Sequence, residues 1–336
     1  MHRRVIWIGK DVELPLIGCV AFGIIDRGTN LLQIRPASGC NLSCPFCSVD
    51  EGPLSKTRIT QYFVETDYLL EYAREIARRK KCSELEMHID GCGEPTLHPE
   101  IVEIVQALSE IEKVSVISMQ TNGTLLDERR IEELSEAGLT RFNLTINALD
   151  DELARKLAGT DRYELSRVLD AARTISESSS DLLIAPVWMK GVNDSEIPKI
   201  IEFARDIGAG KRFPALGIQN YLIHRAGRKM KGVKQMSWKE FYGRLKELET
   251  KFEMKLILSP KDFGIYRCDE AFPRNFRKFE KVSVRILAPG WMRGEMLGVA
   301  GDRTVTVVDA EGLQIGERVK VRIIGNKHNI YLARAL

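Results

Sequence analysis

Between about residue 31 and residue 260, short apolar runs alternate with longer segments in which apolar residues recur every three or four positions. The short runs predict buried strands, and the longer segments predict amphipathic helices. Because the two kinds alternate six times, we expect parallel strands joined by right-handed crossovers. The expected strands cover residues 31–35, 85–89, 114–119, 141–147, 182–189 and 215–222.

The helices expected between and after these strands cover residues 64–79, 99–108, 127–137, 151–157, 163–175, 195–207 and 238–252. Pro99 suits the first turn of a helix, and Gly138 stands at a C-cap position. Six such units predict an α/β fold, namely an open or partial (β/α)6 barrel of the TIM type. Its ligands are expected at the carboxyl ends of the strands.

The pattern changes after about residue 278, where short alternating strands are separated by glycine-rich turns. This arrangement predicts a small all-β barrel of the OB type. We therefore expect an N-terminal extension that forms a hairpin or an edge segment, then the partial barrel, a linker and the small barrel. These four segments cover residues 1–30, 31–260, 261–278 and 279–336.

Composition narrows the class of protein only a little. Of the 336 residues, 44% are hydrophobic, which is normal for a globular core, and the formal net charge is +3. That charge is too small by itself to predict a polyanionic partner. No uncharged stretch reaches the length of a membrane span, so we expect no membrane partner. Seven cysteines with no secretory leader predict a reducing cytoplasm.

Three cysteines follow the first expected strand, at Cys40, Cys44 and Cys47, in the spacing C-x3-C-x2-C. Several thiolates on one short loop suit zinc or an iron–sulfur cluster. A structural zinc site or a fully protein-ligated four-iron cluster needs four ligands. No fourth Cys or His stands within the next thirty residues. The loop therefore predicts a metal cluster with one open position, and the alternative is a group of buried free cysteines.

Glycine and polar residues stand at the ends of the next three expected strands. The second strand leads to Gly93-Glu94-Pro95, and the third ends in Thr121-Asn122-Gly123. Along the fourth strand, every second residue is polar, so these side chains share one face. They are Asn143, Thr145 and Asn147. Polar residues that face a barrel interior are costly without a ligand; the alternative is a solvated face on an edge strand.

On these motifs, over about residues 31 to 225, the chain resembles the radical S-adenosylmethionine (SAM) family. The resemblance implies that Cys40, Cys44 and Cys47 hold a 4Fe-4S cluster. It also implies SAM contacts from Phe46, Gly93, Glu94, Pro95, Thr121, Asn122, Asn143, Thr145 and Asn147. The chain departs from the family's Gly-Gly-Glu-Pro motif at Cys92, which stands where the first glycine is usual.

The same resemblance implies the chemistry. In the family, the open iron of the cluster chelates the amino and carboxylate groups of SAM. One electron from an external donor of the ferredoxin or flavodoxin type then leads to cleavage of the sulfonium. The 5′-deoxyadenosyl radical that results abstracts a hydrogen atom from the substrate. We expect the protein to fix the geometry and to exclude water.

The C-terminal segment resembles a TRAM domain, a small RNA-binding β-barrel, at residues 282–286, 294–307 and 316–321. Trp291 is expected to be exposed on a Pro-Gly loop and to stack on a base. The alternatives are a solubilising surface or an oligomer contact. The barrel's basic residues are Arg285, Arg293, Arg303, Arg318, Lys320, Arg322, Lys327 and Arg334. A second basic stretch comprises Lys211, Arg212, His224, Arg225, Arg228, Lys229, Lys231 and Lys234. Together they favour RNA as a partner.

Within the wider family, TRAM domains accompany methylthiotransferases that act on tRNA and carry a second set of three cysteines. Only Cys19 precedes the cluster motif here, so we expect neither an auxiliary cluster nor sulfur insertion. The expected function is radical modification of a tRNA nucleoside, by carbon methylation, rearrangement or oxidation. The alternatives are the same chemistry on a peptide, a protein side chain or a small metabolite, and a non-enzymatic RNA-binding module with structural zinc.

Two further cysteines lie outside these motifs. Cys268 is the catalytic candidate, because a thiol there would be able to deliver a hydrogen atom or to form a covalent intermediate, although most lone cysteines do neither. Cys82 is expected to be free, in the core or on the surface. The sequence does not predict the oligomeric state.

Overall fold

The structure is a computed structural model that describes residues 3–336. The chain divides into two compact units, and each is described by itself. Unit 1 consists of the described residues up to Gly39, together with Ser55–Ser115 and Arg267–Leu336. Unit 2 consists of Cys40–Leu54 and Val116–Tyr266. This division differs from the segments expected from the sequence, because the C-terminal barrel packs with the N-terminal residues.

Unit 1 contains three neighbouring strands, of which β3 and β6 match the first two strands of the predicted alternation. The strand β2 (Gly23–Asp26) is antiparallel to β3 (Leu31–Arg35), which is parallel to β6 (Leu85–Ile89). The bounds of β3 and β6 are those predicted. A further strand, β1 (Arg4–Ile8), pairs in parallel with β5 (Thr60–Val64). The N-terminal extension thus supplies the expected edge segment as β2, and its strand β1 adds a pairing that the sequence does not predict.

The helices of unit 1 are α1 (Thr66–Arg79) and α2 (Ile101–Ser109), with short 3-10 helices η1 (Lys10–Val12) and η2 (Pro95–Leu97). Helix α1 is strongly amphipathic, and its apolar side chains are buried. Because this apolar face is buried, the recurrence of apolar residues every three or four positions predicts the helix correctly. The buried residues of α1 are Leu69, Leu70, Ala73, Ile76 and Ala77.

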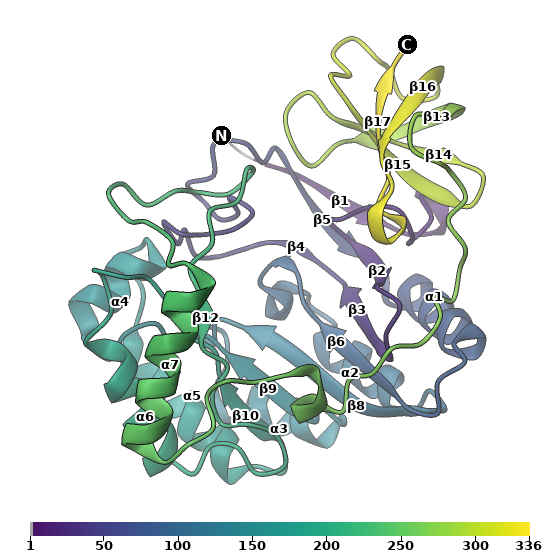
Figure 1. The fold of residues 1–336 in the computed structure, drawn as a ribbon. Helices are drawn as coiled ribbons and strands as arrows, with labels where there is room; N and C mark the ends of the chain where they lie inside the picture. Colours follow the sequence, from purple (N-terminus) through teal and green to yellow (C-terminus); the bar gives the residue numbers. More distant parts are fainter. Residues whose placement is uncertain (1–2) are drawn as a thin grey trace. The chain divides into compact units, whose positions relative to one another are not determined.

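The C-terminal strands of unit 1 form a closed five-stranded barrel, as predicted (Figure 1). Its strands are β13 (Lys281–Pro289), β14 (Met296–Ala300), β15 (Arg303–Val308), β16 (Arg318–Gly325) and β17 (Leu332–Ala335), with the short 3-10 helix η4 (Lys327–Asn329). They close in the order β13-β14-β15-β17-β16. Apolar side chains fill the interior, among them Val284, Val305, Val321 and Tyr331.

The N-terminal segment packs directly on this barrel. The amide of Thr304 donates to the carbonyl of Ile17 at 2.9 Å, and the amide of Tyr331 donates to that of Gly18 at 2.9 Å. Gly18 has a φ of 130°, and a Cβ there would lie 2.0 Å from the Thr304 carbonyl oxygen. Only glycine permits this approach. The barrel is therefore an integral part of unit 1.

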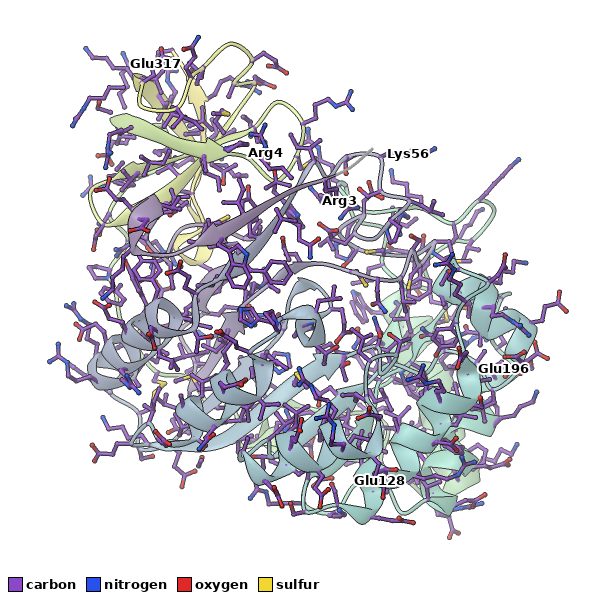
Figure 2. All side chains as sticks on the ribbon, turned by 180° about the vertical axis from the view of Figure 1, so that it is seen from behind. Arg3, Arg4, Lys56, Glu128, Glu196 and Glu317 are labelled. Carbon is purple, nitrogen blue, oxygen red and sulfur yellow. A yellow bond between two sulfur atoms is a disulfide. The ribbon has the colours of Figure 1, made fainter. Side chains whose placement is uncertain are left out.

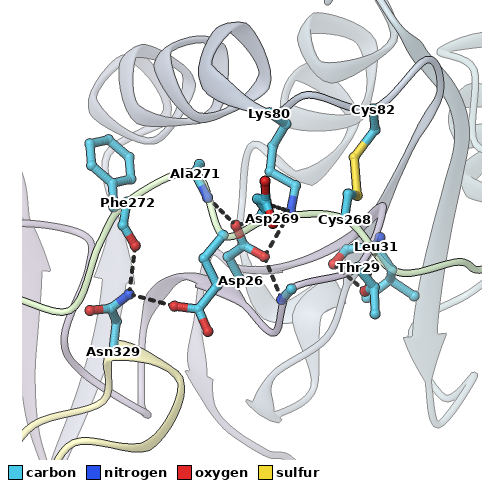
Figure 3. Close-up of polar contacts among 12 residues, drawn as sticks. Asp26, Thr29, Leu31, Lys80, Cys82, Cys268, Asp269, Ala271, Phe272 and Asn329 are labelled. Atoms are coloured by element: carbon cyan, nitrogen blue, oxygen red, sulfur yellow. Dashed lines mark hydrogen bonds and ion pairs between the residues drawn. A yellow bond between two sulfur atoms is a disulfide. The ribbon is translucent and has the colours of Figure 1, made fainter.

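The segment before the barrel is tied to unit 1 by a disulfide and an ion pair (Figure 3). Cys82 and Cys268 form the disulfide. The buried ammonium of Lys80 contacts both carboxylate oxygens of Asp26, at 3.1 and 3.2 Å, and donates to the carbonyl of Asp269 at 2.7 Å. A buried ammonium with three acceptors is fully satisfied. These contacts fix the chain where it enters the barrel.

The disulfide corrects two expectations. Cys82 is not free. Cys268, the catalytic candidate, carries neither a hydrogen atom nor a thiolate in this bonded form, so the structure argues against its catalytic role. The sequence could not reveal the pairing, because 186 residues separate the two cysteines.

Replacing either partner of the disulfide tests its role. We expect Cys82→Ser and Cys268→Ser each to lower the free energy of unfolding by about 3 kcal/mol, because the bond closes a long loop in the unfolded chain. Denaturant unfolding measures this. The SAM cleavage to 5′-deoxyadenosine that the family resemblance implies should be equal in both variants. A loss of 5′-deoxyadenosine formation in Cys268→Ser, but not in Cys82→Ser, would restore the catalytic role predicted for Cys268.

Unit 2 carries the remaining parallel strands. The strand β8 (Val114–Thr121), which belongs to unit 2 from Val116 onward, is parallel to β9 (Arg141–Leu144), and β9 is parallel to β10 (Asp181–Ile184). The fifth predicted strand is interrupted: β10 and the short β11 (Val187–Trp188) flank Pro186, which lacks an amide hydrogen. The sixth shrinks to β12 (Gln219–Asn220), parallel to β11.

The helices of unit 2 are found where the sequence predicts them. They are α3 (Glu128–Glu136), α4 (Asp151–Ala158), α5 (Leu165–Glu177), α6 (Glu196–Asp206) and α7 (Trp238–Phe252), followed by the 3-10 helix η3 (Pro260–Phe263). Side-chain caps define several starts: Asp127 accepts from the amide of Arg130, and Ser237 accepts from that of Glu240. No helix within residues 3–336 is long and apolar enough to cross a membrane.

Candidate functional site

The three cysteines of the predicted cluster motif lie on a loop of unit 2 that begins at Cys40. Its backbone is held by α4: the amide of Ser43 donates to the carbonyl of Ala158 at 2.9 Å. Two glycines allow close backbone approaches that no other residue permits. A Cβ on Gly159 would lie 2.1 Å from the Ser43 carbonyl oxygen, and one on Gly52 would lie 1.6 Å from that of Leu42.

Two of the thiols receive amide hydrogen bonds. The sulfur of Cys40 accepts from the amide of Leu42 at 3.4 Å and from Nδ2 of Asn122 at 3.8 Å. The sulfur of Cys47 accepts from the amide of Glu51 at 3.4 Å. Such donors stabilise negative charge on sulfur and tune the potential of an iron–sulfur cluster. The loop is therefore equipped for thiolate ligands.

The third thiol, Cys44, is held in its neutral form when no metal is bound. Burial, and to a lesser extent the neighbouring Cys47, raise its pKa to about 12 against the opposing effect of the Arg228 guanidinium. Within residues 3–336, no group of three or more His, Cys, Asp or Glu side chains is arranged around a single metal ion. An iron–sulfur cube does not require such a group, because each thiolate binds a different iron. Three thiols on one loop, two with amide donors, fit a cluster with one open iron.

Asn122 ties the end of β8 to the cluster loop. Its Nδ2 donates to Oδ1 of Asn41 at 3.0 Å, while its Oδ1 accepts from the amide of Thr124 at 3.0 Å. Thr121 is buried beside it, and its hydroxyl accepts from the amide of Gly123 at 3.1 Å. The structure thus brings the predicted residues Thr121 and Asn122 to the loop, where Asn122 contacts Cys40 directly.

The polar residues predicted on the fourth strand keep one face, although β9 itself ends at Leu144. Asn143, Thr145 and Asn147 are half-buried, while the residues between them are fully buried. Each has a polar neighbour within unit 2. Oδ1 of Asn143 accepts from Nε of Arg141, and the hydroxyl of Thr145 accepts from Nε2 of Gln120.

Asn147 differs from the other two because its side chain supports the chain that follows β10. Its Oδ1 accepts from the amide of Val187 at 2.8 Å, and its carbonyl accepts from Nδ2 of Asn193 at 2.9 Å. Phe46 is half-buried on the cluster loop. The SAM contacts predicted for these residues remain predictions.

In unit 1, the predicted Gly-Glu-Pro turn follows the short strand β7 (Cys92–Gly93), which is parallel to β4 (Ser38–Gly39). The amide of Glu94 donates to the carbonyl of Gly39 at 2.8 Å, and a Cβ on Gly93 would lie only 1.6 Å from that oxygen. Glycine is required here because the backbones touch. The buried Glu94 carboxylate accepts from the amide and the hydroxyl of Thr96 through Oε1, at 3.2 and 2.7 Å.

Cys92, which departs from the family motif, belongs to a buried polar network of unit 1. Its thiol donates to the carbonyl of Val20 at 3.2 Å and lies 3.5 Å from Nη1 of Arg35. Arg35 in turn makes a bidentate pair with Asp90, at 2.9 and 3.1 Å. A glycine at position 92 would leave this space unfilled. We therefore assign Cys92 a packing role beside Arg35.

Known proteins resemble this chain in sequence over most of its length. An uncharacterized protein of Methanocaldococcus jannaschii is 42% identical over an alignment of 351 positions, which covers 98% of this chain and 80% of that protein. The GTP 3′,8-cyclase of Chlorobaculum tepidum is 32% identical over 206 residues, which cover 61% of this chain and 59% of the cyclase. The chain thus spans about three fifths of the length of that cyclase.

Among solved structures, Streptococcus suis SuiB has a TM-score of 0.52 at 19% identity, over 68% of this chain and 48% of SuiB. The structure of SuiB bound to S-adenosylmethionine has a TM-score of 0.51 at 21% identity, over 68% of this chain and 49% of SuiB. These likenesses show the fold: an α/β partial barrel, followed in this chain by the five-stranded barrel. The model of the Radical SAM superfamily matches residues 34–204, which include the cysteine loop and the Gly-Glu-Pro turn. The chain therefore belongs to the radical SAM superfamily and is an enzyme that uses a 4Fe-4S cluster and SAM.

Proposed function

We propose that this radical SAM enzyme modifies RNA, with a tRNA nucleoside as its substrate, and that the C-terminal barrel binds the RNA as a TRAM domain does. One observation supports the proposal above all: a stripe of cations on the outer face of the barrel. We call Lys281, Arg318, Lys320 and Arg322 the basic stripe. Nitrogen-tipped side chains project from this barrel (Figure 2).

The basic stripe follows from strand alternation. On β16, Arg318, Lys320 and Arg322 are exposed, and Val321 between them is buried in the barrel. In the antiparallel register, Arg322 stands directly opposite Lys281 of β13. On its other side, Arg322 stands opposite Arg334 of β17. The cations therefore gather on one face of three adjacent strands.

Like charges that face one another across strands destabilise a sheet. Two neighbouring arginines have acidic partners, Arg285 with Glu13 and Arg334 with Asp309. In the part of the chain that the structure describes, the four residues of the basic stripe form no ion pair with a carboxylate. A phosphate backbone would neutralise them, and such contacts supply most of the affinity for nucleic acids.

Two RNA contacts that were expected on the barrel must be withdrawn. Trp291 is only 5% exposed, and the guanidinium of Arg58 lies 3.7 Å from its ring centroid. It is not available to stack on a base. Arg303 is 1% exposed and donates through Nη2 to the carbonyl of Pro273 at 3.0 Å. Both side chains belong to the packing of unit 1, so any RNA contact is made by the exposed strands.

When bound, the cluster and SAM supply an electron and a 5′-deoxyadenosyl radical that abstracts a hydrogen atom from the substrate. The chain's own residues prepare the site. Cys40, Cys44 and Cys47 would hold the cluster, and Glu94 would accept from the amino group of SAM. Asn122 fixes the cluster loop through Asn41. An external donor of the ferredoxin or flavodoxin type would deliver the electron.

The experiment that tests the proposal compares tRNA nucleosides from cells with and without the gene by mass spectrometry. We expect one modified nucleoside to disappear in the deletion strain and its precursor to accumulate. The proposal fails if every nucleoside is unchanged. In that case the metabolite and peptide profiles of the same cells identify the second candidate function.

That second candidate is modification of a nucleotide-sized metabolite or of a peptide. The relatives favour it: GTP 3′,8-cyclases share about 30% identity with this chain, and SuiB has been solved with its precursor peptide SuiA. These relatives match only 61%, 68% and 69% of this chain. The basic stripe is the feature that this candidate leaves unexplained.

A further inference from the structure

Arg228 lies in a basic segment that the sequence assigns to a phosphate-binding surface, yet its side chain is turned toward the cluster loop of the same unit. Only 16% of that side chain is exposed. Nη1 donates to the carbonyl of Cys44 at 2.9 Å, and Nη2 donates to that of Glu51 at 2.6 Å. Nε pairs with Oδ1 of Asp50 at 2.8 Å. One guanidinium therefore bridges three points of the loop.

The backbone beside Arg228 follows the loop equally closely. The amide of Arg228 donates to the carbonyl of Cys47 at 2.8 Å. A Cβ on Gly227 would lie 2.7 Å from the carbonyl oxygens of both Cys47 and Ser48. Glycine is needed for so close an approach. The carbonyls of two cluster cysteines thus accept from a single residue that follows them by some 180 positions in the chain.

Asp50 is the acidic partner in this contact. It is buried, and its backbone has a φ of 54°, in the left-handed region that aspartate adopts more readily than most residues other than glycine. A buried carboxylate needs a charged or hydrogen-bonding partner. The ion pair with Arg228 supplies one. The pair is therefore part of the loop's architecture.

We infer that Arg228 is a positioning residue for the iron–sulfur cluster: it clamps the loop at Cys44, Cys47 and Glu51 and places a fixed positive charge beside the thiolates. The inference concerns the cofactor that the family requires and is independent of the RNA substrate. Arginine suits the role because its planar fork serves several acceptors at once, whereas lysine presents a single point charge. A positive charge close to an iron–sulfur cluster favours its reduced, more negative state.

The test uses the full-length protein, reconstituted anaerobically as wild type, Arg228→Gln and Arg228→Lys. The matched control is Arg225→Gln, an exposed arginine of the same segment. Iron release to a chelator, EPR of the reduced cluster and its midpoint potential are measured. Arg228→Gln should release iron about tenfold faster, because it loses charge-assisted hydrogen bonds, and should show a more negative potential. Arg228→Lys should recover the potential but not the retention of iron.

Thermal melting of the metal-free variants separates cluster positioning from general folding. We expect the control to melt close to wild type, and Arg228→Gln to fold cooperatively but melt at a moderately lower temperature, because buried Asp50 loses its partner. Gly227→Ala, which displaces the backbone but keeps the arginine, should also release iron faster. Iron release and potential at wild-type values in Arg228→Gln would overturn the inference. So would equal changes in Arg225→Gln, since any loss of charge from the segment would then suffice.

Discussion

Single replacement of Cys40, Cys44 or Cys47 by alanine will leave no detectable four-iron cluster and no release of 5′-deoxyadenosine. The physical reason is that the loop offers only three thiolates, and an iron–sulfur cube held at three corners has no spare protein ligand when one is lost. In Cys40→Ala the amide of Leu42 loses the sulfur that it stabilises, and in Cys47→Ala the amide of Glu51 does. Iron and sulfide per chain, EPR of the dithionite-reduced protein and chromatography of the SAM products measure the effect.

The matched control for this series is Cys19→Ala, which removes a buried thiol of unit 1. It should keep a full cluster and wild-type SAM cleavage, with a modest loss of stability. Retention of a four-iron cluster in any of the three loop variants would show that another residue completes the site. In that case no iron of the cluster would lack a protein ligand.

Charge removal from the basic stripe is expected to have the second largest effect, on RNA binding. In Lys320→Gln with Arg322→Gln, affinity for bulk tRNA should fall by about two orders of magnitude at low salt. The slope of log affinity against log salt should decrease by about two, because two phosphate contacts are lost. Filter binding or fluorescence anisotropy over a salt series measures both. Cleavage of SAM in the absence of RNA should be unchanged.

Lys239→Gln with Lys251→Gln removes two exposed charges from α7 and serves as the control for net charge. It should leave the salt dependence as in wild type. If both double variants bind tRNA as well as wild type does, the barrel is not the RNA-binding surface. If both lose affinity equally, the effect comes from total charge and the basic stripe has no special role.

Sequence patterns predicted the parts of the fold that depend on local periodicity. The strands β3 and β6 have the predicted bounds, and the burial of alternate residues continues as far as Asn147 although β9 ends at Leu144. The strand β5 was missed because its partner β1 comes from the N-terminal segment. Pro186 interrupts the fifth strand because proline has no amide hydrogen to donate to a neighbouring strand.

The candidate site was predictable only where residues are close in sequence or follow a family motif. The cysteine spacing and the Gly-Glu-Pro turn are of this kind. The clamp by Arg228 is not, because some 180 residues separate it from Cys44 and basic loops are usually solvated. The pairing of Cys82 with Cys268 and the burial of Trp291 under Arg58 likewise depend on distant segments meeting.

The central claim, that radical chemistry at the three-cysteine loop acts on RNA, is tested most directly by complementation of the deletion strain. Nucleoside mass spectrometry is applied to tRNA from cells that carry wild type, Cys44→Ala or an empty vector. The account predicts that one modified nucleoside returns with wild type and stays absent with Cys44→Ala. An identical tRNA nucleoside profile in all three strains would contradict it.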